Sequence, residues 1–177
     1  MHEDFSLTML KYFCTSFALV FNFSIFTAIS VNAQIVPDYS LGAESPTVIP
    51  NQIVKGVPSD LVSGGATRGV NLFHSFQNFN VGANQGVYFV APPGVNNILT
   101  RVTGNSPSNI YGVLGVLGTA NLFLLNSKGI FFGSNSQLDL NASFLATTAT
   151  SIDFPNGYQF STKNTQSPPL LTINNPI

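Results

Sequence analysis

The side chains able to do chemistry are few in this sequence. Its 177 residues include two histidines, His2 and His74, and a single cysteine, Cys14. Ser75 follows His74, but neighbouring residues on a strand face opposite ways, so the two cannot act together as nucleophile and base. Neither a cysteine nor a nearby carboxylate accompanies His74 to complete a metal site. We therefore expect His74 to be a structural or surface residue, and we predict no metal and no cofactor.

The carboxylates are also too scattered for hydrolase or lyase chemistry. Asp139 and Asp153 lie 14 residues apart, which places them on separate faces if the chain winds in coils of about 22 residues. Polysaccharide hydrolases need paired carboxylates. Gly64, Gly65 and Gly69 lack the order of a phosphate-binding loop. The sequence predicts a protein that is not an enzyme, with a β-helix polysaccharide-active enzyme as a distant alternative.

The composition argues against nucleic-acid binding. Charged residues make up 7% of the chain, against about 25% in a typical soluble domain, while 44% of the residues are hydrophobic. The formal net charge is −1, and lysines and arginines occur singly, so no basic surface is available for phosphates. Asn, Ser, Thr and Gly take the place of charge. These small groups can hydrogen-bond along a stacked backbone.

The N-terminus has the pattern of an export signal. Residues 13–29 are apolar apart from small hydroxyl residues, Cys14 and Asn22. Small residues at Val31 and Ala33 then match a cleavage site, so we predict a signal peptide over 1–33, cleaved between Ala33 and Gln34. The alternative is an uncleaved anchor, because the run is close to the lower limit of about 17 residues for a spanning helix.

Two further expectations concern this segment. Glu3 and Asp4 are acidic where a signal peptide carries positive charge, whereas a start at Met9 would give the basic sequence MLKYF. We therefore predict that translation starts at Met9. Cys14 lies inside the signal, so the exported part has no cysteine and depends on its core and its hydrogen bonds for stability.

After the signal the sequence predicts an almost entirely β protein. Residues 34–50 are rich in proline and are expected to form an irregular arm or cap. Short apolar bursts then alternate with turn sequences of Gly, Asn, Ser and Pro, and no segment has a helical period. The expected strands are 52–54, 71–73, 86–90, 98–102, 109–113, 121–125, 130–132, 138–140, 143–146 and 151–154.

The spacing of these bursts favours a coil. Ile98, Leu122 and Phe144 begin bursts at separations of 24 and 22 residues. We predict an all-β, right-handed parallel β-helix, a single-chain solenoid with an N-terminal cap and extra-helical strands, in which Asn residues at equivalent corners bond one another. A β-sandwich is the alternative. The expected interior residues are Leu122, Leu124, Ile130, Phe132, Leu138, Leu140 and either Phe144 or Leu145, with Phe131 facing outward.

Two stretches carry a resemblance to a known family. Residues 63–114 (SGGATRG…IYGVL) and 119–154 (TANLFLLNSKGIFF…SIDF) resemble the filamentous haemagglutinin N-terminal domain, the two-partner secretion domain, and especially its cyanobacterial versions. The family motif NPNL is similar to residues 119–122, which keep Asn121 and Leu122. The motif NPNGI is similar to residues 126–130, which keep Asn126, Gly129 and Ile130.

The resemblance covers about 34–177 and implies a function. It implies the N-terminal secretion domain of a larger, adhesin-like exoprotein that is exported through the periplasm and is secreted or held at the cell surface. The implied partner is an outer-membrane β-barrel transporter with periplasmic modules that bind the extended chain. Because the C-terminal LLTINNPI is strand-like and uncapped, we expect a domain truncated at its C-terminus.

The residues leave a second reading of the function open. The domain can itself be a surface adhesive module whose flat sheets bind a host or surface glycan or protein. Turn chemistry alone would also demand Asn126 and Gly129, without any partner that reads them. Export with and without a transporter separates the two hypotheses.

Overall fold

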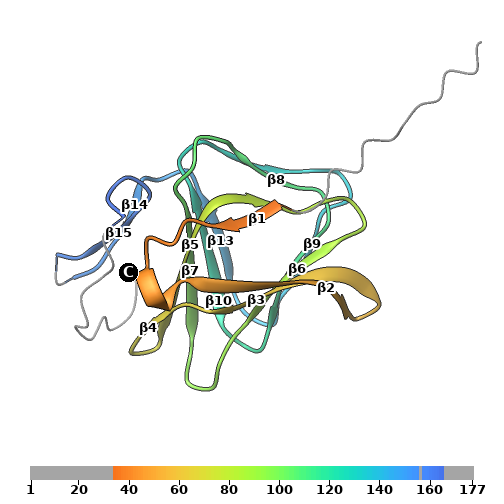
Figure 1. Ribbon diagram of the computed structural model, residues 1–177, viewed down its shortest axis with the longest axis horizontal. Helices are drawn as coiled ribbons and strands as arrows, with labels where there is room; N and C mark the ends of the chain where they lie inside the picture. The colour runs from red at the N-terminus through yellow and green to blue at the C-terminus, as the bar shows by residue number, and fades with distance from the viewer. Residues whose placement is uncertain (1–33, 156, 166–177) are drawn as a thin grey trace, which may run out of the picture.

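The computed structural model describes residues 34–155 and 157–165 (Figure 1). The predicted signal peptide, Met9 and Ala33, and the C-terminal LLTINNPI lie outside these residues. Within them, no helix is long and apolar enough to cross a membrane. The elements are β1 (Gln34–Pro37), η1 (Gly42–Glu44), β2 (Pro46–Val54), β3 (Val57–Gly64), β4 (Ala66–Arg68), β5 (Asn71–Asn80), β6 (Gly86–Val90), β7 (Asn97–Val102), β8 (Ser108–Ile110), β9 (Val113–Leu117), β10 (Asn121–Asn126), β11 (Ile130–Phe132), β12 (Gln137–Asp139), β13 (Phe144–Thr147), β14 (Ser151–Asp153) and β15 (Gln159–Ser161).

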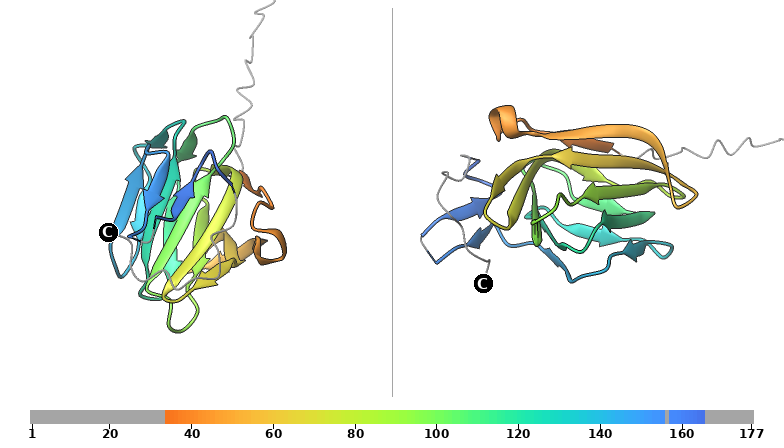
Figure 2. Two further views of the ribbon diagram at one scale, coloured as in Figure 1. Left: turned by 90° about the vertical axis from the view of Figure 1, so that its left-hand side faces the viewer. Right: turned by 90° about the horizontal axis from the view of Figure 1, so that it is seen from below.

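Three sets of parallel strands form the sides of a coil. One sheet stacks β5, β7, β10 and β13, a second stacks β3, β6, β9 and β12, and β8 pairs with β11 in a third. After β7 the chain passes through the third, second and first sheets in turn, and then repeats the circuit. Figure 2 shows the stack as a run of colours from the orange cap to the blue last rung. The predicted parallel β-helix is confirmed.

The register of the first sheet confirms the repeat expected from the sequence. Leu72 pairs with Ile98, Ile98 with Leu122, and Leu122 with Phe144. The four side chains therefore stack in one column. From each of them to the next, the chain advances by 26, 24 and 22 residues, which is the length of each coil. Because every rung has an apolar residue at the same inward position, that position can be found from the spacing of apolar residues in the sequence.

A ladder of asparagines lies beside this column. The Asn97 side-chain amide donates to Oδ1 of Asn71 at 2.8 Å, and the Asn121 amide donates to Oδ1 of Asn97 at 2.9 Å. The ladder ends where the backbone N–H of Ser143 donates to Oδ1 of Asn121 at 3.0 Å. An amide both donates and accepts, so identical residues can satisfy one another in a stack, as the sequence predicted.

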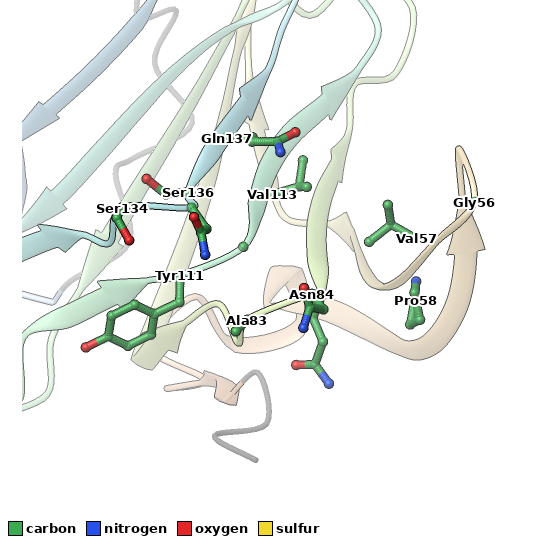
Figure 3. A pocket seen from close by; sticks show the side chains of 13 residues that line it. Gly56, Val57, Pro58, Ala83, Asn84, Tyr111, Val113, Ser134, Ser136 and Gln137 are labelled. Atoms are coloured by element: carbon green, nitrogen blue, oxygen red, sulfur yellow. The ribbon is translucent and has the colours of Figure 1, made fainter. Parts of the chain in front are cut away.

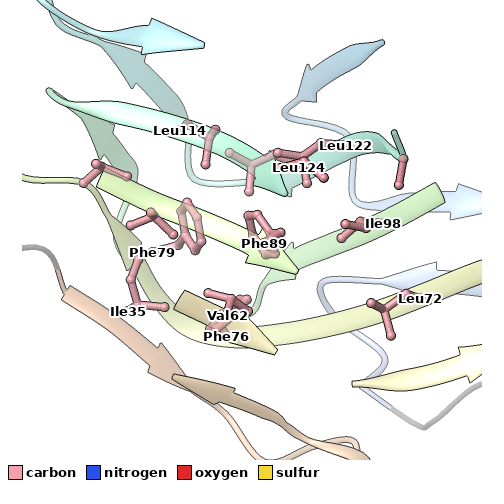
Figure 4. Packing of buried hydrophobic residues seen from close by; sticks show 14 of the residues in the cluster. Ile35, Val62, Leu72, Phe76, Phe79, Phe89, Ile98, Leu114, Leu122 and Leu124 are labelled. Carbon is pink, nitrogen blue, oxygen red and sulfur yellow. The ribbon is translucent and has the colours of Figure 1, made fainter. Parts of the chain in front are cut away.

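The interior of the coil is filled by aliphatic and aromatic side chains. Figure 4 shows side chains from β5, β6, β7, β9 and β10 meeting between the sheets. The fully buried members include Val62, Phe76, Phe79, Val87, Phe89, Ile98, Ile110 and Leu114. A second apolar cluster lies on the outer face of the first sheet, where Phe73 and Leu99 are covered by Phe160 of β15 and by Phe154, which follows β14 in the same antiparallel pair. This pair is the extra-helical element that the sequence predicted.

The N-terminal cap is more regular than predicted. The prediction of an irregular arm over 34–50 is wrong, because β1 pairs antiparallel with β5, and β2 pairs antiparallel with β3. The cap thus covers the first strand of two sheets. Its prolines are tolerated because they lie at strand ends, Pro37 and Pro46, or at an irregularity, Pro50 beside Asn51 with φ +59°.

The last rung is less buried than predicted. Leu124 is 1% exposed. Phe132 and Leu138 stack on the core residues Ile110 and Leu114 and so face inward as predicted, but they are 38% and 49% exposed. Ile130, Leu140 and Phe144 are partly buried against the core, whereas Leu145 is on the outer side. Phe131 faces outward as expected. Inward positions of this rung have a coil on one side only, so geometry alone leaves them half covered.

One predicted strand is a corner. Residues 109–113 were expected to form a single strand, but β8 ends at Ile110 and β9 begins at Val113. Gly112 makes the corner close-packed, because an added Cβ there would overlap the carbonyl oxygens of Gln85 and Gly82. The backbone of one rung therefore rests directly on the turn of the rung before it.

Candidate functional site

The first half of the family-like motif lies at the start of β10. Asn121 is the last amide of the ladder, and its backbone N–H donates to the carbonyl of Asn96 at 2.8 Å. Leu122 is 1% exposed in the core, and its N–H donates to the carbonyl of Ser143 at 2.9 Å. Both residues thus hold the third rung between its neighbours.

The second half of the motif is the turn from β10 to β11. The side chain of Asn126 is fully buried, and its amide donates to Ser108 Oγ at 3.0 Å and to the Ser106 carbonyl at 3.1 Å. Its Oδ1 accepts the N–H of Lys128 at 2.9 Å. Gly129 has φ +120°, a conformation that L side chains rarely adopt, and its N–H donates to the Asn126 carbonyl. Asn126 therefore closes its own turn and anchors it to the previous rung.

The two positions where the motif departs from the family pattern lie near the surface. Ser127, in the place of proline, is half-buried, and its hydroxyl accepts a hydrogen bond from Thr162 Oγ1 at 3.3 Å. Lys128, in the place of asparagine, is exposed, so its charge stays in water. Ile130 begins β11 opposite Ser108. Turn and ladder chemistry accounts for each retained motif residue in the folded state.

His74 is a structural residue. It is fully buried, its ring stacks on Phe89 with centroids 5.4 Å apart, and Nε2 lies 3.0 Å from the Gly64 carbonyl. A carbonyl can only accept, so Nε2 carries the proton. Burial lowers the pKa of His74 to about 4, against the smaller opposing effect of the Gly64 carbonyl. Ser75 points to the other side of β5, toward Asp38, so the two do not meet, as expected.

The largest polar feature was missed in the sequence. Arg101 on β7 is fully buried and donates five hydrogen bonds. Their acceptors are Ser75 Oγ (2.8 Å), Ser40 Oγ (2.9 Å) and the carbonyls of Ser161 (2.8 Å), Asn164 (3.3 Å) and Thr165 (2.8 Å). Its guanidinium also lies 4.7 Å from the centre of the Phe160 ring. One side chain thus joins the N-terminal arm, the coil and the segment after β15. The only signal in the sequence was a lone charge inside an apolar strand.

Asp38 completes this cluster. Its carboxylate accepts hydrogen bonds from the hydroxyls of Thr103 (2.6 Å), Ser75 (2.7 Å) and Ser40 (2.7 Å). Burial raises the pKa of Asp38, but these bonds, with that from the Ser40 N–H, outweigh it and leave the pKa lowered. Burial lowers the pKa of Arg101 to about 10, opposed by the charge of Asp38. Both groups are charged at neutral pH.

A second long-range contact crosses the second sheet, and we call it the Lys55 clasp. Lys55, at the tip of the β2–β3 hairpin, bonds both oxygens of Asp139 on β12, at 2.8 and 2.7 Å. The Tyr88 hydroxyl donates to the same carboxylate at 2.9 Å. The bond from Lys55, followed by that from Tyr88, lowers the pKa of Asp139. Asp153 lies on β14 and bonds Ser151, so the two aspartates are on separate elements, as predicted.

Among the described residues, no group of three or more His, Cys, Asp or Glu side chains could hold a metal ion. Gly64, Gly65 and Gly69 are followed by strands β4 and β5. In this part of the described chain, no helix therefore follows these glycines to bind a phosphate at its N-terminus. Gly65 instead makes room for His74, since an added Cβ would overlap its ring. The polar side chains described above therefore have structural roles. They close turns, form the asparagine ladder, and make two long-range contacts, the Arg101 cluster and the Lys55 clasp.

The family model for the TPS secretion domain matches residues 33–177. The chain belongs to the TPS secretion domain family. It is therefore a secretion domain of the two-partner pathway, in a family of non-enzymatic modules carried by secreted exoproteins. No curated protein and no solved structure matches the chain. The resemblance found from the motifs is confirmed, while the cyanobacterial type and the roles of the motif residues stay predictions.

Proposed function

We propose that this TPS domain is the address that an outer-membrane β-barrel transporter reads on a longer, adhesin-like exoprotein. The transporter's periplasmic modules bind the chain while it is extended, before the coil forms. The chain then passes through the barrel, and the β-helix folds on the outer side. Family membership supports the pathway, and the burial of Leu122 and Asn126 supports the order of these events.

The observation that carries the proposal is the burial of two motif side chains, Leu122 and Asn126, in the folded domain. Leu122 is 1% exposed and Asn126 is fully buried. A partner that contacts these side chains must do so before folding. An extended segment with apolar residues at alternate positions suits strand addition, in which backbone hydrogen bonds supply affinity and alternate side chains supply selectivity.

Folding outside also gives export a direction. The residues that would lie in the transporter's binding groove, such as Leu122 and Leu124, are the ones that the coil buries. Burial of a leucine side chain contributes about 1.5–3 kcal/mol. Each completed rung therefore opposes the return of the chain, and no nucleotide is required.

Binding of the isolated periplasmic modules to the chain tests the proposal. We expect the modules to capture the chain diluted from urea and to bind the refolded domain at least about tenfold more weakly. Asn126→Ala should reduce capture of the extended chain, whereas Lys128→Ala, at an exposed neighbouring position, should not. Equal capture of both forms would contradict recognition before folding.

Export in cells supplies an independent test. Co-expression with the transporter should carry the chain into the medium, and omission of the transporter should leave it in the periplasm. If the chain reaches the medium equally well without any transporter, the address function is refuted.

A further inference from the structure

A groove of about 660 Å³ lies where the β2–β3 hairpin passes the corners of the coil. The first residue of β3 that pairs with β6 is Ser59, so Gly56, Val57 and Pro58 of the β2–β3 hairpin extend beyond the end of β6 and form one wall. The other wall consists of three stacked turns, 83–85, 111–113 and 134–137. Figure 3 shows the hairpin on one side, the turns on the other, and Tyr111 at the end away from the hairpin. The volume falls in the range of about 300–1,000 Å³ that is usual for ligand sites.

The walls of this groove are held in place by specific contacts. The Lys55 clasp fixes the hairpin tip next to Gly56 against β12. On the other side, Gly133 packs so closely on Tyr111 that an added Cβ would overlap its ring. The ring is thus supported from one side while Tyr111 remains 37% exposed. An exposed aromatic ring with a fixed orientation is a surface on which a flat, partly apolar ligand can lie.

The lining of the groove selects for a neutral ligand rich in hydroxyl groups. None of its lining residues is charged, and its polar side chains are amides and hydroxyls. Asn84, Ser134, Asn135 and Gln137 are all exposed in or beside it. Amides both donate and accept, so they match hydroxyl groups, which do the same. An anionic ligand would find no cation in the lining, and a cationic ligand no carboxylate.

An extended peptide fits the groove less well. The turns already pair with one another, because Val113 N–H donates to the Gln85 carbonyl at 2.8 Å and Gln137 N–H donates to the Gly112 carbonyl at 3.0 Å. Strand addition needs a free backbone edge. The turns also repeat at the strand spacing of about 4.8 Å, so the polar side chains recur along the groove. A polymer of similar units is the ligand that uses such a recurrence.

We propose that this groove binds a neutral oligosaccharide, with one sugar ring lying on Tyr111 and its neighbours hydrogen-bonded to the amides of Asn84, Asn135 and Gln137. The flat faces of the sheets are not the binding surface, and the outer face of the first sheet is covered by β14–β15. The proposal is independent of the secretion role, because it concerns the folded domain. It gives the domain a binding activity of its own after export.

The test is a titration of the purified protein followed by NMR. Cellohexaose and mannohexaose serve as neutral probes and hexagalacturonate as a charged one, each to about 10 mM. We expect a neutral probe to shift the side-chain amide signals of Asn84, Asn135 and Gln137. Tyr111→Asn should weaken its binding about tenfold. Tyr39→Asn, the same change at a tyrosine that is 71% exposed and outside the groove, should leave binding unchanged.

Three outcomes would overturn the proposal. One is the absence of shifts with either neutral probe. Another is equal or stronger binding of hexagalacturonate, which would contradict the argument from the uncharged lining. The last is binding that Tyr111→Asn and Tyr39→Asn weaken alike, since the contact would then lie outside the groove.

Discussion

Replacement of Arg101 by methionine should be among the most damaging single changes to the folded domain. Methionine keeps much of the length and the apolar stem, but it removes all five hydrogen bonds of the guanidinium. Asn164 is exposed, so water can reach its carbonyl after the change. The Ser161 carbonyl and the Asp38 carboxylate are less accessible to water than the Asn164 carbonyl, and both would lose the nearby positive charge of Arg101.

Removing one partner from a buried charged cluster costs about 3–5 kcal/mol. Arg101 is fully buried, so solvent does not screen the loss. We expect the free energy of unfolding to fall by about this amount, a large part of the about 5–15 kcal/mol that is typical of a domain. Arg101→Lys keeps the charge but has fewer hydrogen-bond donors. Its free energy of unfolding should therefore lie between that of the unchanged protein and that of Arg101→Met.

Urea unfolding followed by circular dichroism measures the change. Arg68→Met is the matched control, because Arg68 is 6% exposed but pairs with Glu44, whose side chain is 44% exposed. Arg68→Met would leave the Glu44 carboxylate open to water, so we expect it to cost less than Arg101→Met. Hydrogen exchange should also rise in β1 and β15 of Arg101→Met, at the two segments that the side chain joins. If both arginine variants unfold at the same urea concentration, the tie is not a major source of stability.

Three further predictions follow from buried or constrained positions. Leu124→Asp should prevent folding, because an unpaired charge in the core is not satisfied, while Phe131→Asp at a 62% exposed position should fold normally; an unchanged circular dichroism melt for Leu124→Asp would refute the inward assignment. His74 has a folded-state pKa of about 4 against 6.5 when unfolded, so the unfolded state binds the extra proton and stability should fall by about 3 kcal/mol as pH drops from 7 to 4. His74→Gln should lack that part of the pH dependence in urea melts, and an unaltered slope would contradict it. Gly129→Ala should cost about 1–3 kcal/mol because of its positive φ, whereas Lys128→Ala should cost almost nothing; equal thermal melts would argue against the strain.

The repeating parts of the fold could be predicted from the sequence. Ile98, Leu122 and Phe144 occupy one column, and the asparagines before the first two form the ladder, because each rung imposes the same demands on the same position. The predicted all-β character comes from the same regularity. The family-like motif was found for the same reason, since its residues turn a corner that the coil repeats.

The parts that happen only once could not be predicted. Arg101 finds its partners in residues 40 and 165, which lie 61 and 64 positions away, and no local pattern reports such a meeting. The β1 strand and residues 46–51 of β2 were missed because they pair with the edge of the first coil, where prolines are tolerated. Phe132 and Leu138 were placed inside because they have the inward pattern, but burial also requires a neighbour on the far side.

Solenoids commonly evolve by duplication or loss of whole coils, since each coil contacts only its neighbours. Lys55 departs from that independence, because it reaches from the hairpin before the first full coil to Asp139 on the final strand of its sheet. An inserted coil would carry Asp139 about 4.8 Å farther away and break the ion pair. The ion pair can therefore form only with the present number of coils between Lys55 and Asp139. Among related domains that keep this pair, we expect coils to be gained or lost outside the interval from β3 to β12.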